Sequence, residues 1–93
     1  MSAAEAHGWG LVNEVVPAGQ LMETARKWAQ EICEAAPLSV RATKQAALLG
    51  LNMSLEDAYN TRFPAQEAMQ GSEDSREGPR AFAERRKPVW QGR

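Results

Sequence analysis

Few side chains in this sequence could perform chemistry, and none stands in a pattern that a reaction requires. The only histidine, His7, precedes Gly8 near the expected end of a short helix, which favours an exposed or capping role over general-base work. Glu56 and Asp57 are neighbours, so they point to different sides of a helix and complement the dipole of its first turn. We therefore predict no catalytic residue in this chain.

Metal and cofactor sites are not predicted either. Cys33 is the only cysteine, so no internal disulfide can form, and no Cys/His group has the spacing of metal ligands. We interpret Cys33 as a small buried apolar residue in a protein of a reducing compartment, and expect a cytoplasmic protein. No G-x-G-x-x-G, Walker-type loop, H-E-x-x-H or C-x-x-C pattern occurs.

The composition is that of an ordinary globular chain. The 93 residues are 43% hydrophobic and 25% charged, and the formal net charge of −1 gives no general attraction to nucleic acid. No stretch approaches the roughly 20 apolar residues that a membrane-spanning helix needs, and the N-terminus lacks a signal-peptide pattern. At this length a stable core requires efficient helix packing, a staple or a partner chain.

The first third of the chain is predicted to be helical, with one extended segment. Ser2 and Glu5 have the spacing of a capping box before a short helix, and Gly10 can adopt the left-handed conformation that ends it. Residues 11–16 are rich in β-branched side chains and are expected to be extended. Apolar residues in 20–36 recur at the spacing of one helical face, which predicts a helix there.

Prolines punctuate the middle of the sequence. Pro37 is well placed to open a helix that continues toward Gly50, because a proline in the first turn loses no intrahelical bond. Ser54 is an N-cap pattern for a helix that follows it. Pro64 falls inside that pattern, where the ring would clash with the preceding turn, so we expect a kink or a break.

The end of the chain is predicted as short pieces. We expect Ser72 to cap a short acidic turn, Gly78-Pro79 to break the chain, and residues 80–86 to form a last short helix. The whole is an all-α chain of four or five short helices. Its alanine-rich faces contribute little burial energy each and favour close packing against another domain or subunit.

Two blocks and a shorter segment carry a family resemblance. The run AAEAHGWGLVNEVVP (residues 3–17) resembles "A-x-E-A-x-x-x-G-L-V-N-x-V-V-P", and SEDSREGPRAFAERRKP (residues 72–88) resembles "S-x-D-x-x-E-G-x-x-A-F-x-E-K-R-x-P". Between them, the segment 36–38 with Lys44 occupies the places of an "A-P-x-A…K" segment. These patterns are those of the C-terminal third of enoyl-CoA hydratase/isomerase (crotonase) proteins, and the last residues especially resemble one bacterial member.

The resemblance implies a fold and an activity for a larger protein. It identifies residues 1–93 with the C-terminal helical, oligomerisation domain of a crotonase-type α/β fold, and implies that the N-terminal spiral domain, which holds the oxyanion hole and catalytic glutamates, is absent. Family members bind acyl-CoA thioesters and add or remove water across the α,β double bond, or shift that bond. We therefore expect coenzyme A only as part of the substrate, and no catalysis by this chain alone.

Two residues are implied to contact coenzyme A. Phe82 and Arg85 stand at the positions of the aromatic and basic residues that lie against the adenine and phosphates of CoA in the family, although Arg85 replaces the usual lysine. Alternatively, Phe82 anchors its helix and Arg85 is a solvated charge. The family also implies a trimer or a hexamer. The other readings are a stand-alone helical interaction module derived from the family and, with no supporting motif, an unrelated adaptor or nucleic-acid binder.

Overall fold

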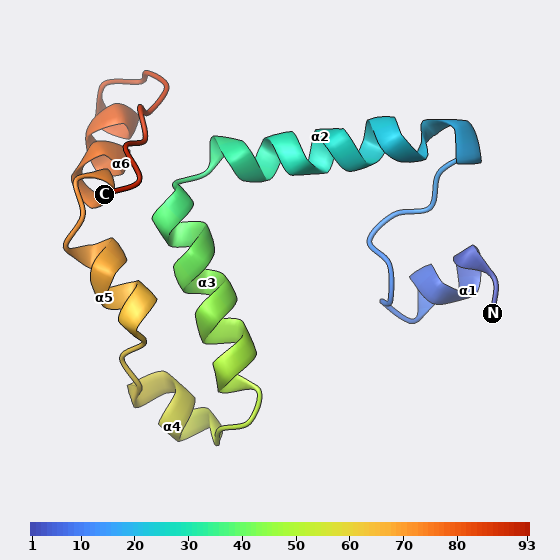
Figure 1. Cartoon of the computed structure of the whole chain (residues 1–93), viewed down its shortest axis with the longest axis horizontal. Coiled ribbons are helices and arrows are strands. Elements are labelled where there is room, and N and C mark those ends of the chain that lie inside the picture. Colours follow the sequence, from blue (N-terminus) through green and yellow to red (C-terminus); the bar gives the residue numbers. More distant parts are fainter. The chain divides into compact units, whose positions relative to one another are not determined.

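All the regular secondary structure of the chain is helical. The computed structural model describes residues 1–93 and contains six α-helices and one 3-10 turn, with no strand (Figure 1). The elements are α1 (Ala3–Gly8), η1 (Ala18–Gln20), α2 (Leu21–Glu34), α3 (Pro37–Gly50), α4 (Leu55–Asn60), α5 (Pro64–Gln70) and α6 (Asp74–Ala83). The predicted all-α class is confirmed. Residues 11–16, predicted to be extended, form bends and irregular backbone.

Two compact units make up the chain, residues 1–31 and residues 32–93. In the first unit, the indole Nε1 of Trp28 on α2 donates to Glu14 Oε2 at 3.0 Å, which ties the irregular segment to that helix. Ala6 is the only buried residue of this unit. The first unit is therefore held mainly by hydrogen bonds along the chain rather than by an apolar core.

The ends of α1 follow the predicted local signals. Ser2 Oγ accepts from the Glu5 amide at 3.2 Å, and the Ser2 amide donates to Glu5 Oε2 at 2.6 Å, so the capping box is formed. This bond to the Ser2 amide lowers the pKa of Glu5. After the helix, Gly10 has φ +74°, the left-handed conformation expected of it.

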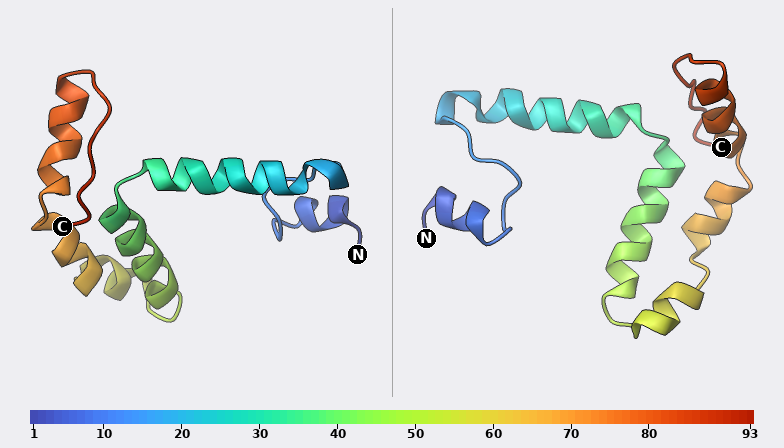
Figure 2. Two further views of the ribbon diagram at one scale, coloured as in Figure 1. Left: turned by 45° about the horizontal axis from the view of Figure 1, so that its top comes forward. Right: turned by 180° about the vertical axis from the view of Figure 1, so that it is seen from behind.

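In the second unit α3 and α5 lie side by side, as the two views of Figure 2 show. Gln45 Oε1 on α3 accepts the Ala65 amide of α5 at 2.9 Å. Phe63, only 5% exposed, lies between α4 and α5, and Pro64 occupies the first turn of α5. The break predicted at Pro64 is thus confirmed, because the proline opens a new helix instead of interrupting one.

The predicted break at Gly78-Pro79 is wrong, as is a separate helix over 80–86. α6 runs without interruption from Asp74 to Ala83 with Pro79 inside it. A proline in a helix interior costs about 3 kcal/mol. The helix continues because side chains of its first two turns are bonded to the chain that follows it, as described below.

The apolar core is small. Only four hydrophobic residues are buried, and three of them are alanines: Ala6, Ala42, Phe63 and Ala81. Seventeen large hydrophobic side chains are exposed, including Leu55 and Tyr59, so the helices present apolar faces that no other part of this chain covers. Cys33 is exposed as well, and its interpretation as a buried residue is wrong. None of the helices is both long and apolar enough to span a bilayer.

Candidate functional site

The C-terminal tail runs back along α6, as Figure 2 shows. The Glu73 amide donates to the carbonyl of Arg93 at 2.8 Å, which brings the last residue to the start of the helix. Ser72 is buried there. Its hydroxyl accepts from the Ser75 amide at 3.1 Å and donates to the Met69 carbonyl at 2.6 Å. This side chain caps the turn that begins α6, as predicted.

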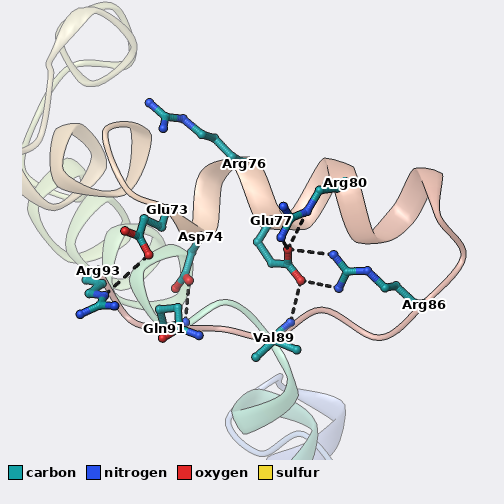
Figure 3. A pocket seen from close by; sticks show the side chains of 9 residues that line it. All are labelled: Glu73, Asp74, Arg76, Glu77, Arg80, Arg86, Val89, Gln91 and Arg93. Carbon is teal, nitrogen blue, oxygen red and sulfur yellow. Dashed lines mark hydrogen bonds and ion pairs between the residues drawn. The ribbon is translucent and has the colours of Figure 1, made fainter.

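Asp74 holds the end of the tail. The residue is 4% exposed, and its carboxylate accepts the amide of Gln91 at 2.7 Å (Figure 3) and the amide of Gly92 at 2.9 Å. Amide donors bonded to a carboxylate form stronger hydrogen bonds than neutral pairs do. In the sequence Asp74 stands out only as part of a motif, whereas in the structure it anchors residues 91–92.

Glu77, one turn further along α6, holds the next part of the tail. It accepts from both Nη atoms of Arg86 at 2.5 and 3.0 Å, from the Val89 amide at 2.9 Å and from Arg80 Nη2 at 2.6 Å (Figure 3). Arg86, the Val89 amide and Arg80 together hold the pKa of Glu77 well below its usual range, and Glu77 in turn raises the pKa of Arg86. A carboxylate this strongly held is a poor general base. Its role is to bind the tail.

Trp90 completes the attachment. Its Nε1 donates to the carbonyl of Glu34 at 2.9 Å, which satisfies the last residue of α2. The indole lies against Gly78, where a Cβ would stand 3.4 Å from Cη2 of the ring. A side chain larger than alanine at this position of the closing motif would therefore displace the tryptophan. We name the contacts of Asp74, Glu77 and Trp90 with their partners the tail clamp.

The turn after α6 has an unusual residue at its centre. The Arg86 amide bonds to the Ala81 carbonyl at 3.0 Å and the Arg85 amide to the Phe82 carbonyl at 3.2 Å, which is the Schellman pattern of a helix end. Arg85 has φ +53°, a position that glycine usually fills. For a residue with a Cβ, this conformation costs roughly 1–2 kcal/mol.

Phe82 and Arg85, the two residues implied to contact a ligand, lie on this turn. Phe82 is 86% exposed, so it does not anchor the helix in a core. The Arg85 guanidinium is exposed and has no hydrogen bond or ion pair, whereas Arg80 and Arg86 are both bonded to Glu77. The structure thus brings an exposed aromatic ring and an unpaired guanidinium onto one turn.

The other residues weighed for chemistry stand apart from this turn. His7 is exposed near the end of α1, as expected. Asp57 donates its amide to Ser54 Oγ at 3.0 Å, so it belongs to the N-cap of α4. Nowhere do three or more His, Cys, Asp or Glu residues gather in an arrangement that could hold a metal ion.

An open hollow of about 720 Å³ lies between α6 and the tail (Figure 3). It is lined by acidic and basic side chains with two tail residues: Glu73, Asp74, Arg76, Glu77, Arg80, Arg86, Val89, Gln91 and Arg93. Most of these charges pair with one another, and Arg76 extends away from the others. The hollow is therefore the surface of the tail clamp, and Arg76 is its one charged side chain that pairs with none of the others.

Comparison with known proteins finds relatives that match the whole chain. The sequence model described as enoyl-CoA hydratase/isomerase matches residues 1–93. The carnitinyl-CoA dehydratase of Salmonella typhi is 43% identical over 100 aligned positions, which cover all of this chain and 37% of that protein. Carnitinyl-CoA dehydratase is the bacterial member that the last residues of the sequence especially resemble.

Solved structures are equally similar. An enoyl-CoA hydratase/isomerase from Mycobacterium paratuberculosis is 43% identical with a TM-score of 0.95, and a candidate short chain enoyl-CoA hydratase from Novosphingobium aromaticivorans is 50% identical with a TM-score of 0.93. All of this chain and 37% of each of those chains are covered. The helices match the C-terminal helical part of these crotonase folds. The chain thus spans about 37% of the length of the relatives it matches.

Proposed function

Because the chain belongs to the enoyl-CoA hydratase/isomerase family, we propose that it forms the C-terminal part of an acyl-CoA hydratase or dehydratase. In this role it serves oligomerisation and completes the binding site for coenzyme A, and it does not catalyse the reaction alone. We further infer a cytoplasmic protein of fatty acid metabolism, consistent with a lone, reduced Cys33.

The turn after α6 carries the proposal for coenzyme A. Base-on-aromatic stacking suits an exposed ring such as Phe82, and a guanidinium can pair with phosphate or stack on adenine. The Arg85 guanidinium is free to make such contacts, because the Glu77 carboxylate is paired with Arg80 and Arg86 instead. The left-handed backbone at Arg85 adds support, since strained non-glycine residues concentrate at functional positions.

The proposed lack of independent catalysis follows from the state of the carboxylates. Asp74 and Glu77, the buried acids of this chain, accept hydrogen bonds from the tail, so their carboxylates are not available to exchange a proton with a substrate. His7 is exposed and belongs to the other unit. The purified chain should therefore not hydrate crotonyl-CoA, which loss of the enoyl absorbance would detect. Turnover at a rate typical of enzymes would contradict the proposal.

The exposed apolar side chains support the proposed role in assembly. Leu51, Leu55 and Tyr59 are at least 80% exposed, and full burial of such a side chain contributes about 1.5–3 kcal/mol. We propose a trimer or a hexamer. Light scattering at micromolar concentration should give a mass above that of one chain, and Leu55→Glu should lower it while Glu56→Gln does not. A monomeric wild-type chain would count against this part of the proposal.

The coenzyme A contact is tested by calorimetric titration of the chain with CoA. Phe82→Ala and Arg85→Ala should each weaken the affinity at least about fivefold, since one base-on-aromatic stack contributes roughly 1–3 kcal/mol. Arg76→Ala is the matched control, because Arg76 is an exposed arginine of α6 without a side-chain partner. Equal affinities for wild type and both test variants would overturn the CoA role. Self-association without CoA binding would favour the stand-alone interaction module.

A further inference from the structure

Glu77 makes contacts that the proposed function does not use. From the second turn of α6 it reaches across to Arg86 and to the Val89 amide, residues 9 and 12 positions later in the chain. These partners lie on either side of residues 87–88. Glu77 thus fixes the path of the chain directly after Arg85.

The conformation of Arg85 needs such support. A residue with a Cβ persists in the left-handed region only where the surrounding structure over-determines it. The next residue, Arg86, is held four times: twice by Glu77, by Glu84 Oε2 at 2.5 Å and by the Lys87 carbonyl at 3.2 Å. Because Arg86 is fixed, the backbone that enters it from Arg85 has little freedom left.

We propose that Glu77 is a positioning residue for the coenzyme A contact: through Arg86 and the Val89 amide, it holds Arg85 left-handed on the same turn as Phe82. This inference rests on the proposed function of that turn. Glu77 does not touch the ligand in this account. The Glu77 carboxylate also pairs with Arg80 and Arg86, so among arginines 80, 85 and 86 only Arg85 has a guanidinium that is free to bind a phosphate.

The experiment measures CoA affinity and the state of the turn separately. The purified 93-residue chain is titrated with CoA and followed by its backbone amide and indole NMR signals. The hydrogen-bonded Nε1–H of Trp90 reports whether the tail is in place, since Asp74 and Trp90 attach it independently of Glu77. Glu77→Gln should keep the Trp90 signal, shift the Arg85 amide and weaken CoA binding about tenfold, as for a turn competent one tenth of the time.

The matched control is Glu73→Gln. Glu73 is an exposed acid beside α6 that pairs only with Arg93 at 3.6 Å, so its substitution should change neither affinity nor the Arg85 signal. Arg86→Gln removes the partner of Glu77 in the same interaction, and Arg76→Gln is the control for the loss of one positive charge. Arg86→Gln should weaken binding as Glu77→Gln does, and the double variant should add little, because both remove one interaction.

The outcomes separate this inference from the proposed function. If Phe82→Ala and Arg85→Ala weaken CoA binding but Glu77→Gln does not, the positioning role is wrong and the CoA contact stands. If neither Phe82→Ala nor Arg85→Ala has an effect, the proposed function itself fails. Should Asp74→Asn weaken affinity as much as Glu77→Gln with the Arg85 signal unmoved, the whole tail would be responsible, and the specific role of Glu77 would be overturned.

Discussion

The substitution Asp74→Asn tests the tail clamp most sharply, because it changes one charge and almost no volume. The carboxylate receives two amide donors, from Gln91 and Gly92, at 2.7 and 2.9 Å. An asparagine has one acceptor oxygen, so it keeps one bond and turns a donor NH2 group toward the other amide. The kept bond also loses its charge assistance.

These losses set the expected magnitude. A hydrogen bond to a charged group contributes about 1.5–3 kcal/mol net, so losing one and weakening the other should cost about 2–3 kcal/mol of the free energy of unfolding. For a chain of this size that corresponds to a decrease in Tm of about 10–20 °C. Loss of a negative charge from the first turn of α6 acts in the same direction.

The assay is urea unfolding followed by helical circular dichroism, at one fixed protein concentration because assembly shifts apparent stability. Glu73→Gln again serves as the control. Its pair with Arg93 is 3.6 Å long and both side chains are mostly exposed, so the expected loss is about 0.5 kcal/mol or less. An Asp74→Asn loss no larger than that of the control would show that the buried carboxylate does not hold the tail.

Three further predictions concern α6 and the turn after it. Gly78→Leu should displace Trp90 and abolish its hydrogen-bonded indole NMR signal, whereas Gly78→Ala, whose Cβ would meet the Trp90 ring at 3.4 Å, should keep that signal. The pKa of Glu77 is lowered on folding, so the stabilisation by its carboxylate is present above the unfolded pKa of about 4.3 and is lost as the pH falls below that value. The difference in Tm between wild type and Glu77→Gln should therefore shrink from pH 7 to pH 3. A constant difference would contradict this prediction. Arg85→Gly removes the strain of the left-handed backbone, so it should raise the free energy of unfolding by about 0.5–1 kcal/mol while it weakens CoA binding. A loss of stability would show instead that the Arg85 side chain stabilises the fold.

Local signals predicted most of the helix ends. The hydroxyl oxygens of Ser2 and Ser54 accept hydrogen bonds from amides three residues later. Pro37 and Pro64 begin helices because the proline ring itself favours the first helical turn. Such features depend on a few consecutive residues, so a single sequence is sufficient to place them.

The structure of α6 could not be predicted in the same way. Gly78-Pro79 is a local signal for a break, and it is overridden by contacts of Asp74 and Glu77 with residues 12 to 18 positions later in the chain. The interpretation of Cys33 as buried rests on the general preference of cysteine for protein interiors, and a residue type alone does not tell whether anything covers its position.

The candidate site was indicated only by resemblance. Nothing in the spacing of Phe82 and Arg85 marks them as a pair, and the left-handed backbone that joins them on one turn is visible only in the structure. The signature that contains Asp74 and Glu77 carries the resemblance as a whole, but the role of its acids as buried tail anchors is visible only in the structure.

An NMR titration of the purified chain with CoA would locate the coenzyme A contact directly. We expect the largest amide shifts on residues 82–86, with smaller changes along the tail and none around His7. Saturable shifts confined to another part of the chain, or no shifts at millimolar CoA, would contradict the claim that the turn after α6 completes a coenzyme A site.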